Sequence, residues 1–320
     1  MEIMGISVSN TNSIKSFFKQ AAIDIGFDDI GFASVEILDK EYRHYLQWLE
    51  AGYHSEMNYL NRRQGKRRDI TMLLENAKTV IVLLHNYNTD YKHSDNKEFG
   101  KISRYAWGDD YHDIIKNKLL VLSNQAEQLY PENKFKSYVD TGPVLEKQWA
   151  VRAGVGWQGK NSLLLNRKLG SYFFIGIIIT DLEIEANKPQ RNYCGSCTAC
   201  IDNCPTGAIV EPYVVDSRKC ISYWTIETKG ATKFPEHISK NLNGWLFGCD
   251  ICQEVCPWNS KPNYVDFDYF KPRLKEFELH LKQILQMPQS EFQLRFKNSP
   301  IKRSKLSGLQ NNARELMQNQ

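Results

Sequence analysis

The sequence predicts an α+β protein in three consecutive parts: a mixed helix and strand domain over residues 1–185, a cysteine-rich module over 186–262, and a basic helical C-terminal segment over 263–320. Three observations predict this order. Apolar runs rich in branched residues alternate with helical patterns in the first part. All eight cysteines lie between residues 194 and 256, and the chain after Pro262 is helical and basic.

Composition narrows the class of protein. The chain has 41 Lys and Arg against 37 Asp and Glu, and a net charge of +4 is too small to indicate a polyanionic partner by itself. The first 30 residues lack the pattern of a secretory signal. The longest apolar run, residues 173–179, is far shorter than a membrane span of roughly 20 residues. We therefore expect a cytoplasmic protein with no membrane segment, in which eight cysteines indicate metal binding or redox work rather than disulfides.

The elements of the first part follow from its apolar patterns. Strands are predicted over residues 79–87, 135–139 and 171–180. Between the first two, apolar residues recur at spacings of three and four, which predicts one face of an amphipathic helix that ends near Pro131. These positions are Ile115, Leu119, Leu122, Ala126 and Leu129. The turn at 140–143 then leads into a helix over about residues 144–153, so Asp140 is predicted to lie at a strand-to-helix corner.

Two cysteine runs carry the strongest signal. Cys194, Cys197, Cys200 and Cys204 precede Pro205 with the spacing C-x2-C-x2-C-x3-C-P, which bacterial ferredoxins use for 4Fe-4S clusters. The second run keeps three cysteines and a proline, but Leu246 stands where its first cysteine belongs.

The remaining cysteine completes the ligands for two clusters. In two-cluster modules the last cysteine of each run binds the other cluster. One cluster is therefore assigned to Cys194, Cys197, Cys200 and Cys256, and the other to Cys204, Cys220, Cys249 and Cys252. Two zinc sites are the alternative, since CxxC pairs also bind zinc, but zinc explains neither the successive x2 spacings nor the prolines.

Other motifs have ordinary explanations. Gly154, Gly156 and Gly159 match GxGxxG and nearly match a phosphate loop, but a predicted helix precedes them and an extended segment follows, which is the wrong context for either. Asp140 alone is typical of a turn or a helix cap. Basic residues cluster at 62–68 and 295–314, which is typical of a solvated face and is also compatible with a phosphate-rich partner.

Several stretches together resemble epoxyqueuosine reductases, which act on tRNA. These are MNYLNRR at 57–63, SRYAWGDDYH at 103–112, VDTGPVLEK at 139–147, GVGWQGKNSLLLNRKLGS at 154–171, SPIKRSKLSGLQNNA at 299–313, and both cysteine runs. The resemblance spans nearly the whole chain. It implies a cobalamin-binding core of nitroreductase-like fold, shared with reductive dehalogenases, joined to a two-cluster ferredoxin-like module.

The resemblance also implies a reaction. The two 4Fe-4S clusters would reduce cobalamin to its cob(I) state, which would reduce the epoxide of epoxyqueuosine to the alkene of queuosine with loss of water. This is the last step of queuosine synthesis in the anticodon loop. An external low-potential electron donor would supply the clusters, and the enzyme is expected to act as a monomer.

The resemblance assigns roles to individual residues. Asp140 matches the family's proton donor, a role that a carboxyl group suits if an apolar, cofactor-covered site raises its pKa. The candidates around the corrinoid are Arg63, Arg104, Tyr105, Lys160, Asn161, Ser162 and Asp250. The candidates for tRNA phosphate contacts are Lys229, Arg303 and Lys305.

Two departures and two rival functions stay open. Asp110 and His112 begin the Asp-x-His-x-x-Gly motif of other cobalamin proteins, but Ile115 stands where its glycine belongs, so a histidine ligand to cobalt is not supported. Many family members carry a longer C-terminal helical extension, so part of the tRNA contact surface is expected to be absent or supplied differently here. The rivals are a corrinoid reductive dehalogenase-like enzyme and a ferredoxin-type electron carrier.

Overall fold

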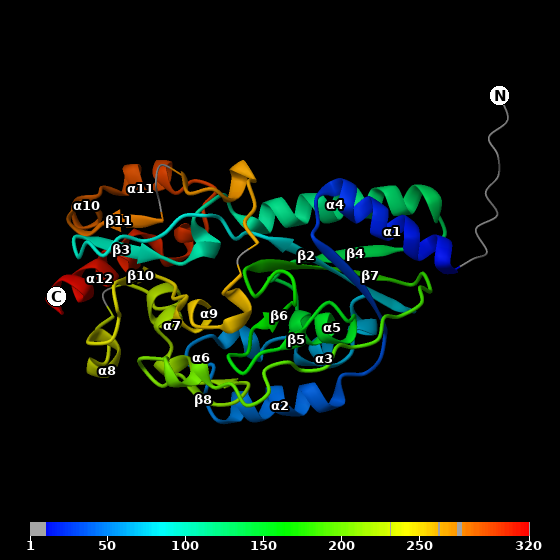
Figure 1. The fold of residues 1–320 in the computed structure, drawn as a ribbon, viewed down its shortest axis with the longest axis horizontal. Helices are drawn as coiled ribbons and strands as arrows, with labels where there is room; N and C mark the ends of the chain where they lie inside the picture. Colours follow the sequence, from blue (N-terminus) through cyan, green and yellow to red (C-terminus); the bar gives the residue numbers. More distant parts are fainter. Residues whose placement is uncertain (1–10, 231, 262, 274–276, 320) are drawn as a thin grey trace.

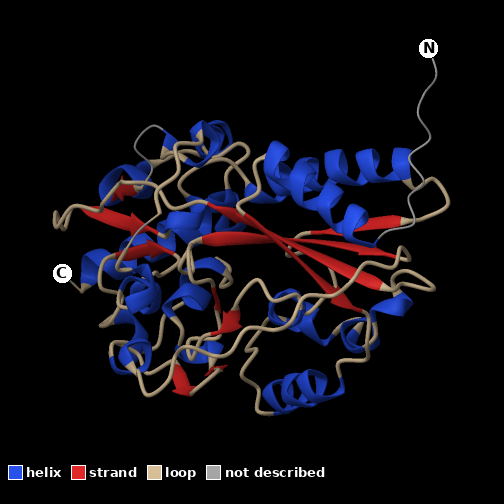
Figure 2. Ribbon diagram, turned by 45° about the vertical axis from the view of Figure 1, so that its right-hand side comes forward, coloured by secondary structure: helices blue, strands red, loops and turns tan. Residues whose placement is uncertain are grey.

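A computed structural model of the protein describes residues 11–230, 232–261, 263–273 and 277–319 (Figures 1 and 2). Residues 1–10 and the predicted boundary at residue 262 lie outside the described residues. None of the helices in the described part of the chain has the length and apolar composition needed to cross a membrane.

A four-stranded antiparallel sheet forms the centre of the first part of the chain. Its strands lie in the order β1 (Asp29–Ser34), β2 (Thr79–Asn86), β7 (Phe173–Thr180) and β4 (Phe135–Tyr138). All eight residues of β2 are buried, as expected for a strand covered on both faces. The three predicted strands are confirmed, apart from one or two residues at an end.

Helices cover both faces of this sheet (Figure 1). On one face, α1 (Thr11–Ile25) and α4 (Tyr111–Leu129) pack on Phe32, Ile81 and Ile178. On the other, α5 (Glu146–Arg152) packs on a core that includes Val82 and Ile177. The predicted amphipathic helix is confirmed as α4, with four of its five apolar positions buried and Leu129 exposed.

A second sheet joins segments that are far apart in the sequence. β3 (Phe99–Ile102) pairs in parallel with β10 (Trp245–Phe247) and antiparallel with β11 (Glu278–His280). Helices α7 (Ile221–Ile226), α10 (Leu281–Gln286) and α12 (Lys305–Gln318) share its core. Each of the three predicted parts therefore contributes one strand, and the proposed domain boundaries run through a common hydrophobic core.

Shorter elements connect these layers. The helices are α2 (Asp39–Glu50), α3 (Gln64–Arg68), α6 (Ala199–Asp202), α8 (Glu236–Ser239), α9 (Ile251–Glu254) and α11 (Gln289–Arg295). The strands pair as β5 (Trp157–Gln158) with β6 (Leu164–Leu165), and β8 (Ile209–Glu211) with β9 (Val214–Val215). The hairpin β5–β6 follows α5 directly, so the glycine motif lacks the strand-then-helix context of a nucleotide loop, as predicted.

A close backbone contact fixes α5 on the sheet. A Cβ atom at Gly31 of β1 would lie 2.2 Å from the backbone oxygen of Ala153, just beyond the C-terminal end of α5. Only glycine lets the strand approach that closely. The contact sets the position of α5, whose first turn carries Glu146 and Lys147.

We expect Gly31→Ala to lower the free energy of unfolding by roughly 1–3 kcal/mol, because the added methyl group meets rigid backbone. Chemical denaturation of the reduced protein measures this. Gly308→Ala in α12 is the matched control: the nearest atoms would lie 3.5 Å away, and alanine favours a helix interior, so the change is expected to be neutral or stabilising. Equal losses of unfolding free energy in the two variants would contradict a specific role for the close contact at Gly31.

A candidate active site between the sheet and the cysteine module

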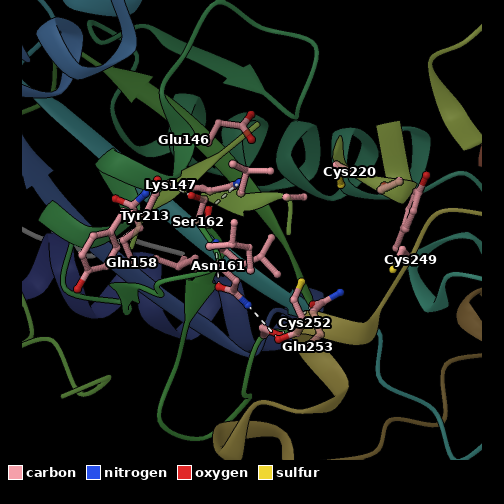
Figure 3. Close-up of a pocket in the computed structure, with 18 of the residues that line it drawn as sticks. Glu146, Lys147, Gln158, Asn161, Ser162, Tyr213, Cys220, Cys249, Cys252 and Gln253 are labelled. Carbon is pink, nitrogen blue, oxygen red and sulfur yellow. Dashed lines mark hydrogen bonds between the residues drawn. The ribbon is translucent and has the colours of Figure 1, made fainter. Parts of the chain in front are cut away.

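A cavity of ≈ 750 Å³, here called the large cavity, lies between the four-stranded sheet and the cysteine-rich module. Figure 3 shows Glu146, Lys147 and Asn161 on one side of it and Cys220 and Cys249 on the other. Much of its wall is apolar or aromatic: Tyr45, Trp48, Leu60, Tyr87, Tyr105, Val144, Leu163, Phe173 and Ile175. Among the described residues, no histidine lines it.

Asp140 lies at the rim of the large cavity, in the loop that links β4 to α5. Its backbone is left-handed, with φ of 52°, which aspartate tolerates better than most residues. The backbone N–H donates to Glu146 Oε1 at 2.6 Å. The carboxylate Oδ2 accepts from the Tyr111 hydroxyl at 2.9 Å and lies 3.2 Å from His112 Nε2. Two neighbours therefore orient the carboxylate, which is 62 % exposed.

A chain of polar groups leads from Asp140 to the C-terminal segment. His112 Nδ1 lies 2.8 Å from Asp110 Oδ1, and Asp110 Oδ2 lies 2.9 Å from Lys302 Nζ. Asp110 also caps α4, because its carboxylate accepts from the His112 backbone N–H. His112 is thus held between two carboxylates, one of which is anchored by a lysine.

These contacts place the proton on His112 rather than on Asp140. Burial acts to raise the pKa of Asp140, but hydrogen bonds from His112 and Tyr111 outweigh it, and the pKa lies below its usual value. The raised pKa expected of Asp140 in a cofactor-covered site stays a prediction; in this arrangement the two hydrogen bonds lower the pKa. Burial acts to lower the pKa of His112, but its bonds to Asp110 and Asp140 outweigh burial and raise the pKa to about 9. Near neutral pH the pair is an imidazolium and a carboxylate.

Glu146 is a second carboxyl group beside Asp140 that can hold a proton near neutral pH. It was not among the residues identified from the sequence. Burial, followed by the charge of Asp140, raises the pKa of Glu146 to about 8. Its neighbour Lys147 lines the same cavity and donates to the backbone oxygen of Ser162 at 3.1 Å. Both residues lie in the VLEK stretch at 144–147 that carries the resemblance, so their sequence signal was present.

The predicted corrinoid contacts divide into two groups. Tyr105, Asn161, Ser162 and Asp250 line the large cavity. Arg63, Arg104 and Lys160 are not among its lining residues.

Arg104 and Arg63 do not line the large cavity because their side chains are placed elsewhere. Arg104 packs on the rings of Trp107 and Tyr172, and its Nη1 donates to the Thr89 backbone oxygen. Arg63 is exposed just before α3. The arginine that lines the cavity is Arg67, one turn further along α3, which residue spacing alone did not distinguish from Arg63.

The turn between β5 and β6 clamps the cysteine-rich module to the sheet domain. Lys160 Nζ donates to the backbone oxygens of Gly195 at 2.8 Å and Cys197 at 2.9 Å. Asn161 Nδ2 donates to the Cys252 backbone oxygen at 3.2 Å, and Ser162 Oγ donates to that of Tyr213 at 2.5 Å. The side chains of these three predicted cofactor contacts therefore form hydrogen bonds mainly to the backbone of the cysteine-rich module.

Asp250 is a buried carboxylate that connects the module to β3. It accepts from Ser103 Oγ at 2.5 Å and from the Arg104 backbone N–H at 2.8 Å. It is 1 % exposed, and burial raises its pKa despite these bonds. Because Asp250 separates Cys249 from α9, the same bonds hold the cysteines beside the large cavity.

The eight cysteines divide between two cavities. Cys204, Cys220, Cys249 and Cys252 line the large cavity, whereas Cys194, Cys197, Cys200 and Cys256 line a neighbouring one of ≈ 540 Å³, here called the small cavity. These are the two ligand sets assigned from the sequence. Asn161 lines both cavities and so lies between the sets.

The thiols have the surroundings of cluster ligands. All eight are free, and backbone N–H groups point at several sulfurs, including Ala208 N at 3.2 Å from Cys204 Sγ. Leu246, which replaces the missing cysteine, is fully buried in β10, and Cys220 at the start of α7 lines the cavity instead. Within the described residues, no three His, Cys, Asp or Glu side chains are grouped closely enough to share one metal ion.

The predicted tRNA contacts lie just after α7 and around the start of α12, two segments that Arg303 links through Glu227. Lys229, Arg303 and Lys305 are exposed. Arg303 is not a free cation, because it forms a two-pronged ion pair with Glu227 at 2.8 Å and lies over the Tyr59 ring. Its guanidinium would have to leave Glu227 to bind a phosphate.

Known proteins resemble this chain over nearly its whole length. The family described as 4Fe-4S double cluster binding domain matches residues 193–259, and the family described as epoxyqueuosine reductase QueG matches residues 67–141. An epoxyqueuosine reductase of Atelocyanobacterium thalassa is 41% identical over 309 residues, which cover 94% of this chain and 98% of that protein. That of Escherichia coli is 38% identical over 86% of this chain and 72% of its own length.

Solved structures agree with the sequence matches. The crystal structure of an epoxyqueuosine reductase with a tRNA-Tyr stem loop that carries epoxyqueuosine has a TM-score of 0.91 and 30% identity, and it covers 97% of this chain and 82% of the other. A Bacillus subtilis epoxyqueuosine reductase, with an aspartate-bearing catalytic loop swung out of its active site, has a TM-score of 0.90 and 29% identity over the same shares.

Replacement of Cys220 by serine tests the ligand set of the large cavity. Anaerobic reconstitution is expected to give about eight irons per unaltered chain and about four per Cys220→Ser chain, because one cluster loses a ligand. Iron and sulfide analysis measures both. Ser222→Ala, which alters a neighbouring lining residue without removing a thiol, should keep about eight. Full iron content in the Cys220 variant would show that this thiol is not a ligand.

Proposed function

The chain belongs to the epoxyqueuosine reductase family, and on that premise we propose that it reduces epoxyqueuosine in tRNA to queuosine. The observation that carries the proposal is one cavity that has a hydrogen-bonded carboxylate at its rim and four cysteines in its wall. An acid and an electron source thus face the same space. The protein is an oxidoreductase that carries two 4Fe-4S clusters, one for each set of four cysteines.

The large cavity also fits the corrinoid that the resemblance implies. Its aromatic and aliphatic walls suit a broad flat body, and Lys147 and Tyr105 supply polar atoms in its lining. The absence of a histidine among the described lining residues agrees with the incomplete Asp-x-His-x-x-Gly motif. When bound, cobalamin would supply the two electrons that the epoxide accepts, after they have passed through the clusters.

The chain's own residues would supply the protons. Conversion of an epoxide to an alkene consumes two electrons and two protons and releases one water. Near neutral pH the Asp140–His112 pair holds one proton, on His112, so the first of the two protons passes from His112 through Asp140, and the second reaches the pair from solvent. His112 is therefore the group that recharges Asp140, while Asp110 and Lys302 hold the imidazole in place.

Substrate delivery depends on the surface beside this site. Arg303 and Tyr59 lie near the Asp140 rim, and they would offer an exposed ring to an anticodon loop and, once Arg303 leaves Glu227, a cation. We propose that tRNA binding draws Arg303 away from Glu227. A cytoplasmic location, a monomeric state and an external low-potential electron donor complete the proposal.

Asp140→Asn is expected to lower turnover by roughly 100-fold or more, because the amide cannot donate an acidic proton. Mass spectrometry of tRNA nucleosides, after incubation of reconstituted enzyme with reductant and epoxyqueuosine-containing tRNA, measures the conversion. Asp113→Asn, on the exposed side of α4, is the control and should stay active. If the Asp140 variant turns over as fast as the unaltered enzyme, Asp140 is only a turn residue. If the unaltered enzyme, loaded with its cofactors, converts no epoxyqueuosine, the proposed function is refuted.

His112→Gln is expected to slow turnover roughly 10-fold and to change its pH profile. Because the His112 pKa is raised to about 9, the unaltered enzyme keeps its proton supply below that pH and loses it as the pH rises through about 9. The variant should lack this falling limb. If both proteins show the same alkaline limb, His112 has only a structural role.

A further inference from the structure

The small cavity is where the cysteine sets come closest to solvent. Cys197 is the exposed member of the eight cysteines, and the other seven are partly buried. The small cavity adjoins the large one through Asn161. The cysteine set with an exposed thiol therefore offers a donor protein a direct approach, and the surface around the small cavity affects which donor can bind there.

Four cations surround this entrance: Arg167, Lys168, Arg191 and Lys261, here called the basic rim. All four are exposed. Arg167, Lys168 and Lys261 line the small cavity, and none of its described lining residues is an aspartate or glutamate. No contact within 4 Å pairs a rim cation with a described acidic side chain, although Lys168 interacts with the charge of Asp29 at longer range, whereas Arg303 is paired directly with Glu227. Lys160, which also lines the cavity, is occupied by the carbonyls of Gly195 and Cys197.

Part of the basic rim is held in position by aromatic rings. The guanidinium groups of Arg167 and Arg191 lie 5.4 and 4.7 Å from the centre of the Tyr193 ring. Tyr193 in turn packs against Trp157 and Trp258, at 5.0 and 5.7 Å between ring centres. Cations fixed on a rigid aromatic support lose little conformational entropy when a partner binds.

Two other uses of these cations are less consistent with their placement. Cations that only balanced a cluster's negative charge would be buried beside it, whereas these are exposed and project their field into solvent. Cations for tRNA phosphates are expected beside Asp140, where the modified base must react. The basic rim instead surrounds the small cavity, which Asp140 does not line.

We propose that the basic rim is the docking surface for an acidic one-electron carrier protein, which reduces the cluster in the small cavity. The carrier is oxidised by one electron and the cluster is reduced by one, and no covalent bond forms or breaks. Opposite charges speed the encounter and orient the carrier over Cys197. The proposal rests on a 4Fe-4S cluster in the small cavity and is independent of the epoxide reaction.

The test follows cluster reduction in reconstituted enzyme without tRNA, so that its failure is separate from failure of the epoxide chemistry. Reduced flavodoxin, an acidic carrier, is mixed with the enzyme by stopped flow, and bleaching of cluster absorbance gives the second-order rate constant. Arg167→Glu combined with Lys168→Glu should lower this constant by about 10-fold or more at low salt. Added salt should slow the unaltered protein more than the variant.

Matched controls separate docking from net charge. Lys116→Glu with Lys282→Glu makes the same charge change on exposed residues of α4 and α10, and should leave the rate within about 2-fold. Reduced methyl viologen, a small cation, should reduce the rim variant no more slowly than the unaltered protein. If the rim variant loads less iron, Arg191→Gln with Lys261→Gln takes its place.

Three results would overturn the proposal. One is a rim variant that flavodoxin reduces as fast as the unaltered protein. The second is equal slowing of the rim variant and its charge-matched control. The third is an unaltered flavodoxin rate together with tRNA binding weakened by about 10-fold, which would assign the basic rim to nucleic acid.

Discussion

The structure depends on the hydrogen bonds that the turn at 160–162 makes to the backbone of the cysteine-rich module. Lys160 holds the loop around Cys197, Asn161 holds Cys252, and Ser162 holds Tyr213. Both cavities exist because two parts of the chain meet across this turn. On the opposite side, buried Asp250 ties the module to β3. A short polar turn and one carboxylate therefore set the distance between the cysteines and the Asp140 loop.

Local patterns predicted much of the fold and of the site. The strands β2 and β7, the helix α4 and the corner at Asp140 all follow from apolar runs and turn residues that lie next to one another in the sequence. The sheet β10–β3–β11 could not be predicted in this way. Its strands have only three or four residues, and β10 pairs in parallel with a strand more than 140 positions earlier. Such pairing is decided by tertiary packing.

The pKa of Asp140 was harder to predict than its position in the fold. Asp140 could be identified from its stretch, but its pKa depends on His112 and Tyr111, which reach it from the start of α4. His112 depends in turn on Asp110, and Asp110 on Lys302 from the far end of the chain. Contacts over such sequence distances leave no periodic signal. Arg67, rather than the predicted Arg63, lines the large cavity for a simpler reason. Which of the two arginines faces the cavity depends on the direction of one turn of α3.

The crossed arrangement of the cysteines has a consequence for how the protein matures. The small cavity takes three thiols from the first run and Cys256 from the second, and the large cavity combines Cys204 with thiols that follow it. During synthesis, the large-cavity set is incomplete until Cys252 has been made, and the small-cavity set is incomplete until Cys256 has been made. Neither native ligand set can therefore form before nearly the whole cysteine-rich module has been synthesised.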